Sequence, residues 1–204
     1  MFSLIIILPY DPDYPVVCMD ETNKQLAGEA RAPIPGKPGR LKRIDDEYVR
    51  NGVVEIFMKM EPLAGGRHVA VTERRTRKAW ARQIKSMLDE RCPEAIKVRL
   101  IMDNLNTHNI ASLYETFEPR EAQRLASRLE IHHTPKHGSR LNMAEIELSA
   151  LKGQCLDRRI GDMCTIKAEI PAWENHRNSS VKAINWQFTT PEARIKLKNI
   201  YPKC

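Results

Sequence analysis

Two short apolar runs, each followed directly by an aspartate, constrain this chain more than any other feature of its sequence. Val16–Met19 leads into Asp20, and the largely apolar Val98–Met102 leads into Asp103. Short apolar runs of this length are typical of buried strands. We therefore expect two buried strands that each carry a carboxylate at their end, and the carboxylates meet if the strands are neighbours in one sheet.

The rest of the chain alternates strand and helix signals and predicts an α/β fold. Strand patterns at 48–60 and 68–72 with Gly65-Gly66 near the turn indicate an antiparallel meander, and a short strand is expected at 129–133. We therefore predict a mixed five-stranded sheet flanked by helices, of which the ribonuclease H-like fold is one arrangement. Helices are expected at 77–91, 110–117, 120–128, 141–155 and 165–176, and from Thr190 onward.

Length, charge and cysteine usage favour a single domain, spanning 1–204, that binds nucleic acid. The 204 residues are enough for a single core. The formal net charge of +7 and the pI of about 9.2 favour polyanionic partners. Five cysteines without a CxxC pair argue against a zinc knuckle or a disulfide framework and favour a reducing cytoplasm. The apolar start at 2–8 is too short to span a membrane, so no membrane partner is expected.

A basic segment rich in proline and glycine interrupts the strand patterns at about 31–46. Ala32–Gly39 contains three prolines and two glycines, which exclude a helix and a sheet ladder alike. We expect a protruding loop whose cations make sequence-independent contacts with phosphates. A second basic cluster at 74–78 either extends this track or is a solvated helix start. The basic residues of the loop are Arg31, Lys37, Arg40, Lys42 and Arg43.

The acidic residues suggest a site for two divalent metal ions. Two such ions about 3.5 to 4 Å apart can cleave a phosphodiester, and Mg²⁺ or Mn²⁺ takes carboxylate ligands. Asp20 and Asp103 would supply two ligands and a helix the third. Glu145 and Glu147 lie about 200° apart around a helix, so only one of them can face the site. We choose Glu145, because it lies where the apolar stripe of the helix borders the sheet edge. Its side of the helix also carries Asn142, Ser149 and Lys152.

Each acidic residue also has a purely structural interpretation. Asp103 could end a strand and cap the next segment. Glu145 could close a capping box with Asn142, and Glu21 could be a solvated surface charge. Taken singly, none of these residues identifies an active site.

The motifs around the acidic residues resemble those of DDE transposases in the mariner-type superfamily, most closely in its bacterial insertion-sequence branch. Val17–Glu21 resembles the first acidic motif, Asp103–His108 the second and Thr134–Glu145 the third, in the order that the family has. Leu141-Asn142 within the third motif is the most specific element. The resemblance extends over about 10–202.

This resemblance implies an enzyme, a transposase with a ribonuclease H-like core that binds two Mg²⁺ or Mn²⁺ ions. It implies that Asp20, Asp103 and Glu145 are the catalytic residues and the metal ligands. Water would free a 3′-hydroxyl, which then attacks target DNA at a TA dinucleotide. The implied partners are DNA and a second subunit, either in a homodimer or in a full-length transposase, toward which the 31–46 loop reaches. Residues that would line the site or contact phosphates are Asn104, His108, Lys136, His137 and Asn142.

The chain departs from the family in two places. Relatives carry helix-turn-helix modules ahead of the catalytic domain, whereas only 19 residues precede Asp20. We therefore expect a truncated or separately encoded catalytic part, associated with the nucleoid in a bacterial cytoplasm. Arg140 replaces the usual tryptophan near Glu145. The alternatives are a catalytically idle fragment that regulates by pairing with full-length transposase or binding DNA, and a cellular ribonuclease H or repair nuclease, against which Leu141-Asn142 argues.

Overall fold

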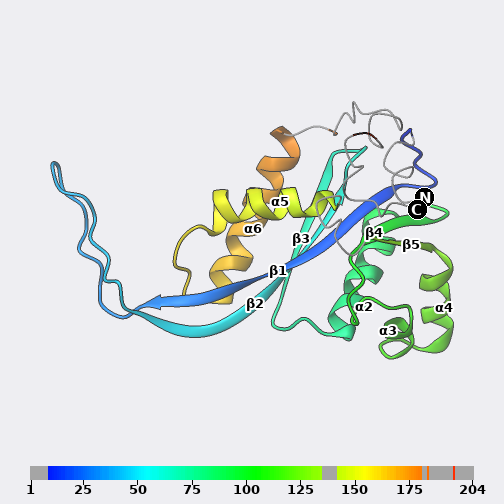
Figure 1. Cartoon of the computed structure of the whole chain (residues 1–204), viewed down its shortest axis with the longest axis horizontal. Helices are drawn as coiled ribbons and strands as arrows, with labels where there is room; N and C mark the ends of the chain where they lie inside the picture. The colour runs from blue at the N-terminus through cyan, green and yellow to red at the C-terminus, as the bar shows by residue number, and fades with distance from the viewer. Residues whose placement is uncertain (1–8, 135–141, 181–182, 184–194, 196–204) are drawn as a thin grey trace.

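A five-stranded mixed sheet forms the centre of the molecule (Figure 1). The computed structural model describes residues 9–134, 142–180, 183 and 195. The strand order is β3-β2-β1-β4-β5, with antiparallel pairing of β1 with β2 and of β2 with β3, and parallel pairing of β4 with both β1 and β5. The predicted mixed sheet of five strands is therefore confirmed. The strands are β1 (Val16–Glu29), β2 (Tyr48–Glu61), β3 (Gly66–Thr72), β4 (Val98–Met102) and β5 (Leu129–His133).

Helices flank this sheet, and two of them continue into π-helical turns where the sequence predicted unbroken α-helices. In the described ranges no helix is both long and apolar enough to cross a membrane. The helix expected from Thr190 lies outside the described residues. The helices are α2 (Arg77–Ser86), α3 (Ala111–Tyr114), α4 (Pro119–Ser127), α5 (Met143–Leu151) and α6 (Met163–Ser180), with the turns η1 (Met87–Arg91) after α2 and η3 (Lys152–Leu156) after α5.

Alternation along the strands builds two hydrophobic cores. Val16 and Cys18 of β1 belong to the core shared with α5 and α6, whereas Val17 and Met19 belong to the core shared with α2, α3 and α4. Trp80 of α2 is fully buried in the second core. Because helices cover both faces of the central strands, the start of β1 and most of β4 are apolar on both faces, which explains their continuous apolar runs.

The course of β1 corrects the expectation that Asp20 ends a strand. β1 continues to Glu29, because β2 pairs with it as far as the Glu29 and Tyr48 partners. Its parallel pairing with β4 stops earlier, at Cys18 and Ile101. Asp20 therefore lies inside a strand, but just beyond the end of a parallel strand pair.

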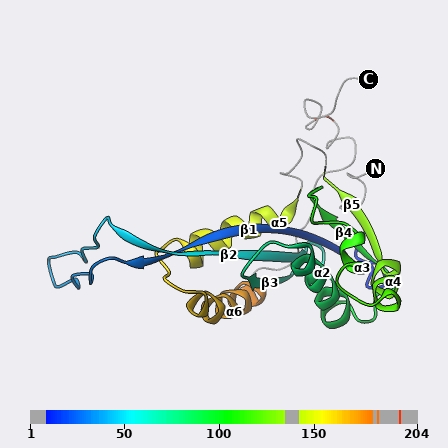
Figure 2. The same ribbon diagram turned by 90° about the horizontal axis from the view of Figure 1, so that it is seen from below.

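The far ends of β1 and β2 leave the body as a two-stranded ribbon whose tip, residues 30–47, we call the arm. The arm extends beyond all the labelled helices (Figure 2). Backbone bridges join Ile34 to Arg43 and Lys37 to Arg40. Arg159 holds the base of the arm by donating hydrogen bonds to three successive backbone carbonyls at 45–47. The basic loop expected at about 31–46 lies in the arm.

Candidate active site

Asp20 and Asp103 are brought together at the end of the β1–β4 pair. Each lies two residues beyond the paired positions Cys18 and Ile101. Asp20 points to the α5 side of the sheet, as Cys18 does, because side chains alternate along a strand. Parallel strands in register carry equivalent positions to the same edge of the sheet. The two strands that precede Asp20 and Asp103 are therefore neighbours, as the sequence prediction required.

The start of α5 brings Glu145 to the same edge. Asn142 caps this helix: its Oδ1 accepts a hydrogen bond from the Ala144 amide at 3.2 Å, and its Nδ2 donates to the Met19 carbonyl at 2.9 Å. The cap therefore ties the first turn of α5, which contains Glu145, to the residue directly before Asp20. The buried Asn142 amide forms these bonds inside the protein, and its role in lining the site or contacting phosphates stays a prediction.

Glu145 and Glu147 face different surroundings, as helical geometry predicts. Glu147 is buried, and its carboxylate accepts hydrogen bonds from Arg67 at 3.2 Å and from Arg177 at 2.9 Å. Glu145 is half-buried and, among the described contacts, makes no side-chain bond to Asn142. The capping-box interpretation therefore finds no support, and the Glu145 carboxylate is available for other ligands.

We call the sheet edge where Asp20, Asp103 and Glu145 lie the acidic edge. A cleft of about 420 Å³ extends from it along α5, and we call this the acidic cleft. Its lining includes Asp20 and Glu145 together with Ser149 and Lys152. Ser149 and Lys152 follow Glu145 at helical steps of four and seven, so all three share one face of the helix. The cleft thus has carboxylates at one end and an exposed ammonium group close by.

The carboxylates at this edge repel one another. Burial, together with the smaller effect of the negative charges of Glu21, Asp103 and Glu145, raises the pKa of Asp20 to about 7, although a hydrogen bond from the Glu21 amide lowers it. In the described part of the chain no basic side chain forms an ion pair with Asp20 or Glu145. A divalent cation would relieve this repulsion, and hard cations take carboxylate ligands. The donor set therefore fits Mg²⁺ or Mn²⁺.

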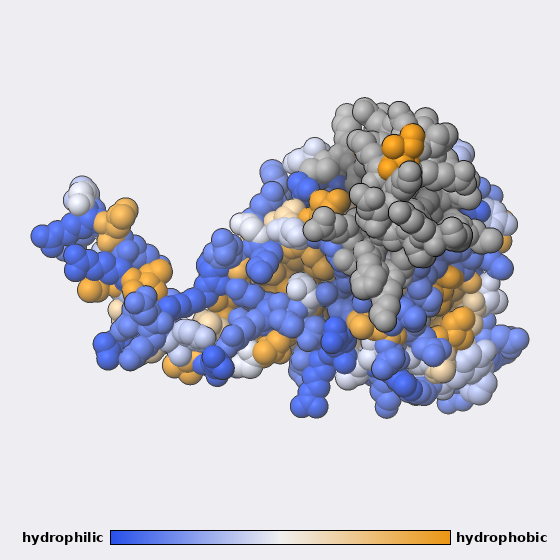
Figure 3. Space-filling model, in the orientation of Figure 1, coloured by the Kyte–Doolittle hydropathy of each residue, from blue (hydrophilic) through white to orange (hydrophobic). Residues whose placement is uncertain are grey.

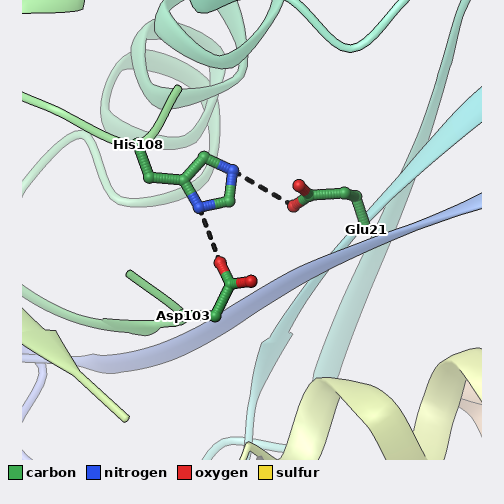
Figure 4. Close-up of side chains that lie close together, drawn as sticks. All are labelled: Glu21, Asp103 and His108. Atoms are coloured by element: carbon green, nitrogen blue, oxygen red, sulfur yellow. Dashed lines mark ion pairs between the residues drawn. The ribbon is translucent and has the colours of Figure 1, made fainter. Parts of the chain in front are cut away.

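A buried histidine lies behind Asp103 (Figure 4). His108 Nδ1 is 2.8 Å from Asp103 Oδ1, and its Nε2 is 3.1 Å from Glu21 Oε2. Its ring stacks on Trp80 with 5.9 Å between centroids. Burial lowers the pKa of His108, but the two carboxylates outweigh this effect and raise the pKa to about 9. The His108 side chain is 0% exposed and lies against Asp103, and its role in lining the site or contacting phosphates stays a prediction.

Glu21, Asp103 and His108 are also the one set of metal-ligand side chains, among the described residues, whose candidate atoms all lie within 4.8 Å of one another. Asp20, Asp103 and Glu145 are not so close. However, the imidazole lies between the two carboxylates and presents a different nitrogen to each (Figure 4). One ion cannot use both nitrogens of a single ring, so this geometry fits an ion-paired imidazolium better than a metal site.

Glu21 is the functional candidate that sequence reasoning missed. The alternative interpretation of Glu21 as a solvated surface charge does not hold, because its side chain is 1% exposed and also contacts Arg75 at 3.4 Å. Strand alternation could have identified it, since it places Glu21 on the face opposite Asp20. Asn104 is exposed in the loop that follows β4. Four residues named from the third motif lie outside the described residues: Lys136, His137, Arg140 and Leu141.

The basic residues of the arm differ in their surroundings. Arg31 forms ion pairs within the arm, with Asp45 at 3.1 Å and Glu47 at 3.7 Å. The second basic cluster, at 74–78, surrounds the N-terminus of α2, where Thr76 is the cap. The remaining basic residues of the arm are exposed: Lys37, Arg40, Lys42 and Arg43.

A family model described as DDE superfamily endonuclease matches residues 15–167, a segment that contains Asp20, Asp103 and Glu145. The chain belongs to this DDE superfamily. The identification confirms the DDE part of the resemblance that the acidic motifs indicated and makes the chain part of an endonuclease family. No curated protein matches the chain in sequence.

Two solved structures share the fold of this DDE domain. The Mos1 strand transfer complex has a TM-score of 0.57 and 13% sequence identity, covering 85% of this chain and 50% of that chain. The Mos1 transposase paired-end complex with the left transposon end has a TM-score of 0.56 and 15% identity, covering 85% of this chain and 51% of that chain. These matches confirm the ribonuclease H-like fold. The DDE domain spans about half the length of the chains that it matches.

The raised pKa of Asp20 predicts a pH-dependent stability for the metal-free protein. Between the ordinary Asp pKa of 3.8 and about 7, the folded state binds more protons at Asp20 than the unfolded state does. The contribution of Asp20 to the unfolding free energy therefore falls as the pH rises through this window. We expect the unfolding free energy of the wild type, relative to Asp20→Asn, to decrease from about pH 4 to about pH 7 in urea titrations.

Adding Mn²⁺ near neutral pH provides the control. Because the ion binds the ionised carboxylate of the folded state only, it should restore the stability of the wild type more than that of Asp20→Asn. A difference between the two proteins that does not change with pH would contradict the assignment of Asp20 to a buried, repelled carboxylate.

Proposed function

We propose that this chain is the catalytic domain of a DDE transposase, which cleaves DNA and transfers the freed 3′ end to target DNA with two Mg²⁺ or Mn²⁺ ions. The observation that carries the proposal is the convergence of Asp20, Asp103 and Glu145 from two neighbouring parallel strands and a capped helix. Membership of the DDE superfamily endonucleases supports it. The proposal includes a bacterial insertion sequence as the mobile element, a TA target and action at the nucleoid in the cytoplasm.

In this proposal the three carboxylates hold the ions, and the fold orients them before DNA arrives. The register of β1 and β4 sets Asp20 beside Asp103, and the bond from Asn142 to the Met19 carbonyl sets α5 against them. Bound ions would activate the attacking water or 3′-hydroxyl and stabilise the leaving oxyanion. The partial burial of Asp20 strengthens its interaction with a cation, because charges interact more strongly away from bulk water.

The cleft along α5 is the proposed path of the DNA strand. Lys152 and Ser149 lie on the same helix face as Glu145 and line the cleft with it. An exposed ammonium beside the acidic edge is suited to a phosphate next to the one that reacts, whereas a hydroxyl can donate to a phosphate oxygen. Contacts of this kind would make DNA binding salt-dependent and independent of sequence.

The arm is the proposed contact with a second subunit, either in a homodimer or in a full-length transposase. Apolar groups stand out among hydrophilic ones on its surface (Figure 3). Leu41 is 91% exposed and Ile34 is 61% exposed, and basic residues lie between them in the sequence. Apolar side chains gathered on a projecting segment are more favourable against a protein surface than in water.

The test of this function is metal-dependent cleavage and joining by the purified chain. We expect nicking of supercoiled plasmid with Mn²⁺ or Mg²⁺ and none with a chelator, and joining of an oligonucleotide with a free 3′-hydroxyl to the plasmid. DNA binding without nicking by the folded, metal-loaded protein would contradict the proposal and indicate a catalytically idle regulator. Cleavage of an RNA:DNA hybrid but not of DNA would indicate a cellular ribonuclease H.

A further inference from the structure

Glu21 and His108 form a buried pair on the side of the sheet opposite α5. Glu21 follows Asp20 on β1, and strand alternation turns it toward α2, where its side chain is 1% exposed. A buried carboxylate is costly unless charged or hydrogen-bonding groups compensate it. Its ion-pair partners among the described residues are His108 at 3.1 Å and Arg75 at 3.4 Å.

The loop after β4 folds back so that His108 reaches Asp103. The His108 amide donates to the Leu105 carbonyl at 2.9 Å, and the Ser112 hydroxyl holds the neighbouring Thr107 carbonyl at 3.1 Å. Trp80 covers one face of the imidazole. The ring is therefore fixed from three directions: by its own loop, by the indole and by the carboxylate of Glu21.

The contacts of this ring concern only one oxygen of Asp103. His108 Nδ1 approaches Oδ1, so the second oxygen of this carboxylate is available to a metal ion. The contacts of His108 with Asp103 and Glu21 are ion pairs and not straight hydrogen bonds, since neither carboxylate oxygen lies in line with a ring N–H. Asp103 directly follows the last residue of β4 and has no strand neighbour of its own, so it depends on side-chain contacts for its orientation.

We propose that Glu21 and His108 are positioning residues, a buried strut that runs from β1 to Asp103 and orients this carboxylate toward Asp20 for metal binding. This inference rests on the proposed function, because it assumes that Asp103 is a metal ligand. On the side of the sheet opposite α5, the strut links β1 to Asp103 at the end of β4. On the α5 side, Asn142 links β1 to α5. His108 acts through Asp103 and contacts neither DNA nor the ions.

The test is the affinity of the whole chain for Mn²⁺, measured by electron paramagnetic resonance without DNA. We expect His108→Gln and Glu21→Gln to weaken binding by about 10- to 100-fold, the effect typical of groups that orient metal ligands. The double variant should bind no more weakly than His108→Gln alone, because both changes break one strut. His108→Asn should retain most of the affinity, since its amide nitrogen can replace Nδ1 beside Asp103.

A second histidine–glutamate pair supplies the matched control. His68 lies 3.2 Å from Glu174 and lines a different cavity from the acidic cleft, so His68→Gln should leave the Mn²⁺ affinity unchanged. Circular dichroism at the temperature of the titration checks that each variant is folded. A loss of affinity shared by His68→Gln would show a general effect of stability and overturn the strut.

The remaining outcomes separate the strut from the proposed function. Mn²⁺ binding that Asp103→Asn abolishes but that Glu21→Gln and His108→Gln leave unchanged overturns the strut alone. A directly coordinated nitrogen in the spin-echo spectrum of bound Mn²⁺, lost in His108→Asn, also overturns it, because His108 would then be a ligand. Absence of Mn²⁺ binding by the wild type overturns the proposed function and the strut with it.

Discussion

Asp103→Asn and Glu145→Gln are each expected to reduce metal-dependent DNA cleavage by roughly a thousandfold or more, while the protein stays folded. A bound metal ion supplies several kcal/mol of transition-state stabilisation, and each 1.36 kcal/mol corresponds to about tenfold in rate. Both side chains are half-buried at an edge where carboxylates repel one another. Replacing a carboxylate by an amide of the same shape therefore removes a metal ligand and relieves repulsion without leaving a cavity.

Rates of plasmid nicking at saturating Mn²⁺ measure this effect. Glu94→Gln is the matched control, because Glu94 is an exposed glutamate outside the acidic cleft, and its nicking rate should equal that of the wild type. If either active-site variant cleaves at the wild-type rate, that residue is not a ligand. Loss of nicking in Glu94→Gln would show that the nicking rate depends on the net charge of the protein and not on the metal ligands.

The second large effect concerns Glu147, which lies two residues beyond Glu145 and should behave in the opposite way. Glu147→Gln is expected to lower the free energy of unfolding by about 3–5 kcal/mol, the cost typical of breaking a buried ion pair by removing one charge. The Arg67 side chain is 0% exposed and the Glu147 side chain 3%, so the loss falls on a guanidinium that is away from water. Arg177, the second partner of Glu147, is more exposed, so the loss of its ion pair costs less stability.

Urea unfolding of the two glutamate variants side by side measures this contrast. Glu145→Gln should unfold at the wild-type urea concentration and be inactive, whereas Glu147→Gln should unfold earlier and keep its activity per folded molecule. Replacing the pair together, as Arg67→Met with Glu147→Leu, should recover much of the lost stability, since the two most deeply buried charges of the cluster are then both removed. Equal stability of Glu147→Gln and the wild type would contradict the structural role of this ion pair.

The strands around the acidic edge show what local pattern can predict. The expected strands at 98–102 and 129–133 coincide with β4 and β5. The run at 98–102 is predictable because a short, largely apolar segment bounded by polar residues is a pattern of neighbouring residues alone. The same reasoning ended the first strand at Asp20, although β1 continues to Glu29. The continuation of β1 beyond Asp20 depends on its pairing with β2, a distant segment, so no local sequence pattern predicts it.

The sequence by itself determined the candidates for the site: two aspartates after buried runs, and a glutamate on one side of a helix opposite Glu147. These follow from periods of two and 3.6 residues, which are local properties of the backbone. Only the tertiary structure decided that Asn142 secures α5 to Met19, 123 residues away, and that His108 and Glu21 are buried behind Asp103. The reason is physical: whether a polar side chain meets solvent or a partner depends on which distant segment covers it, and that is settled when the layers pack.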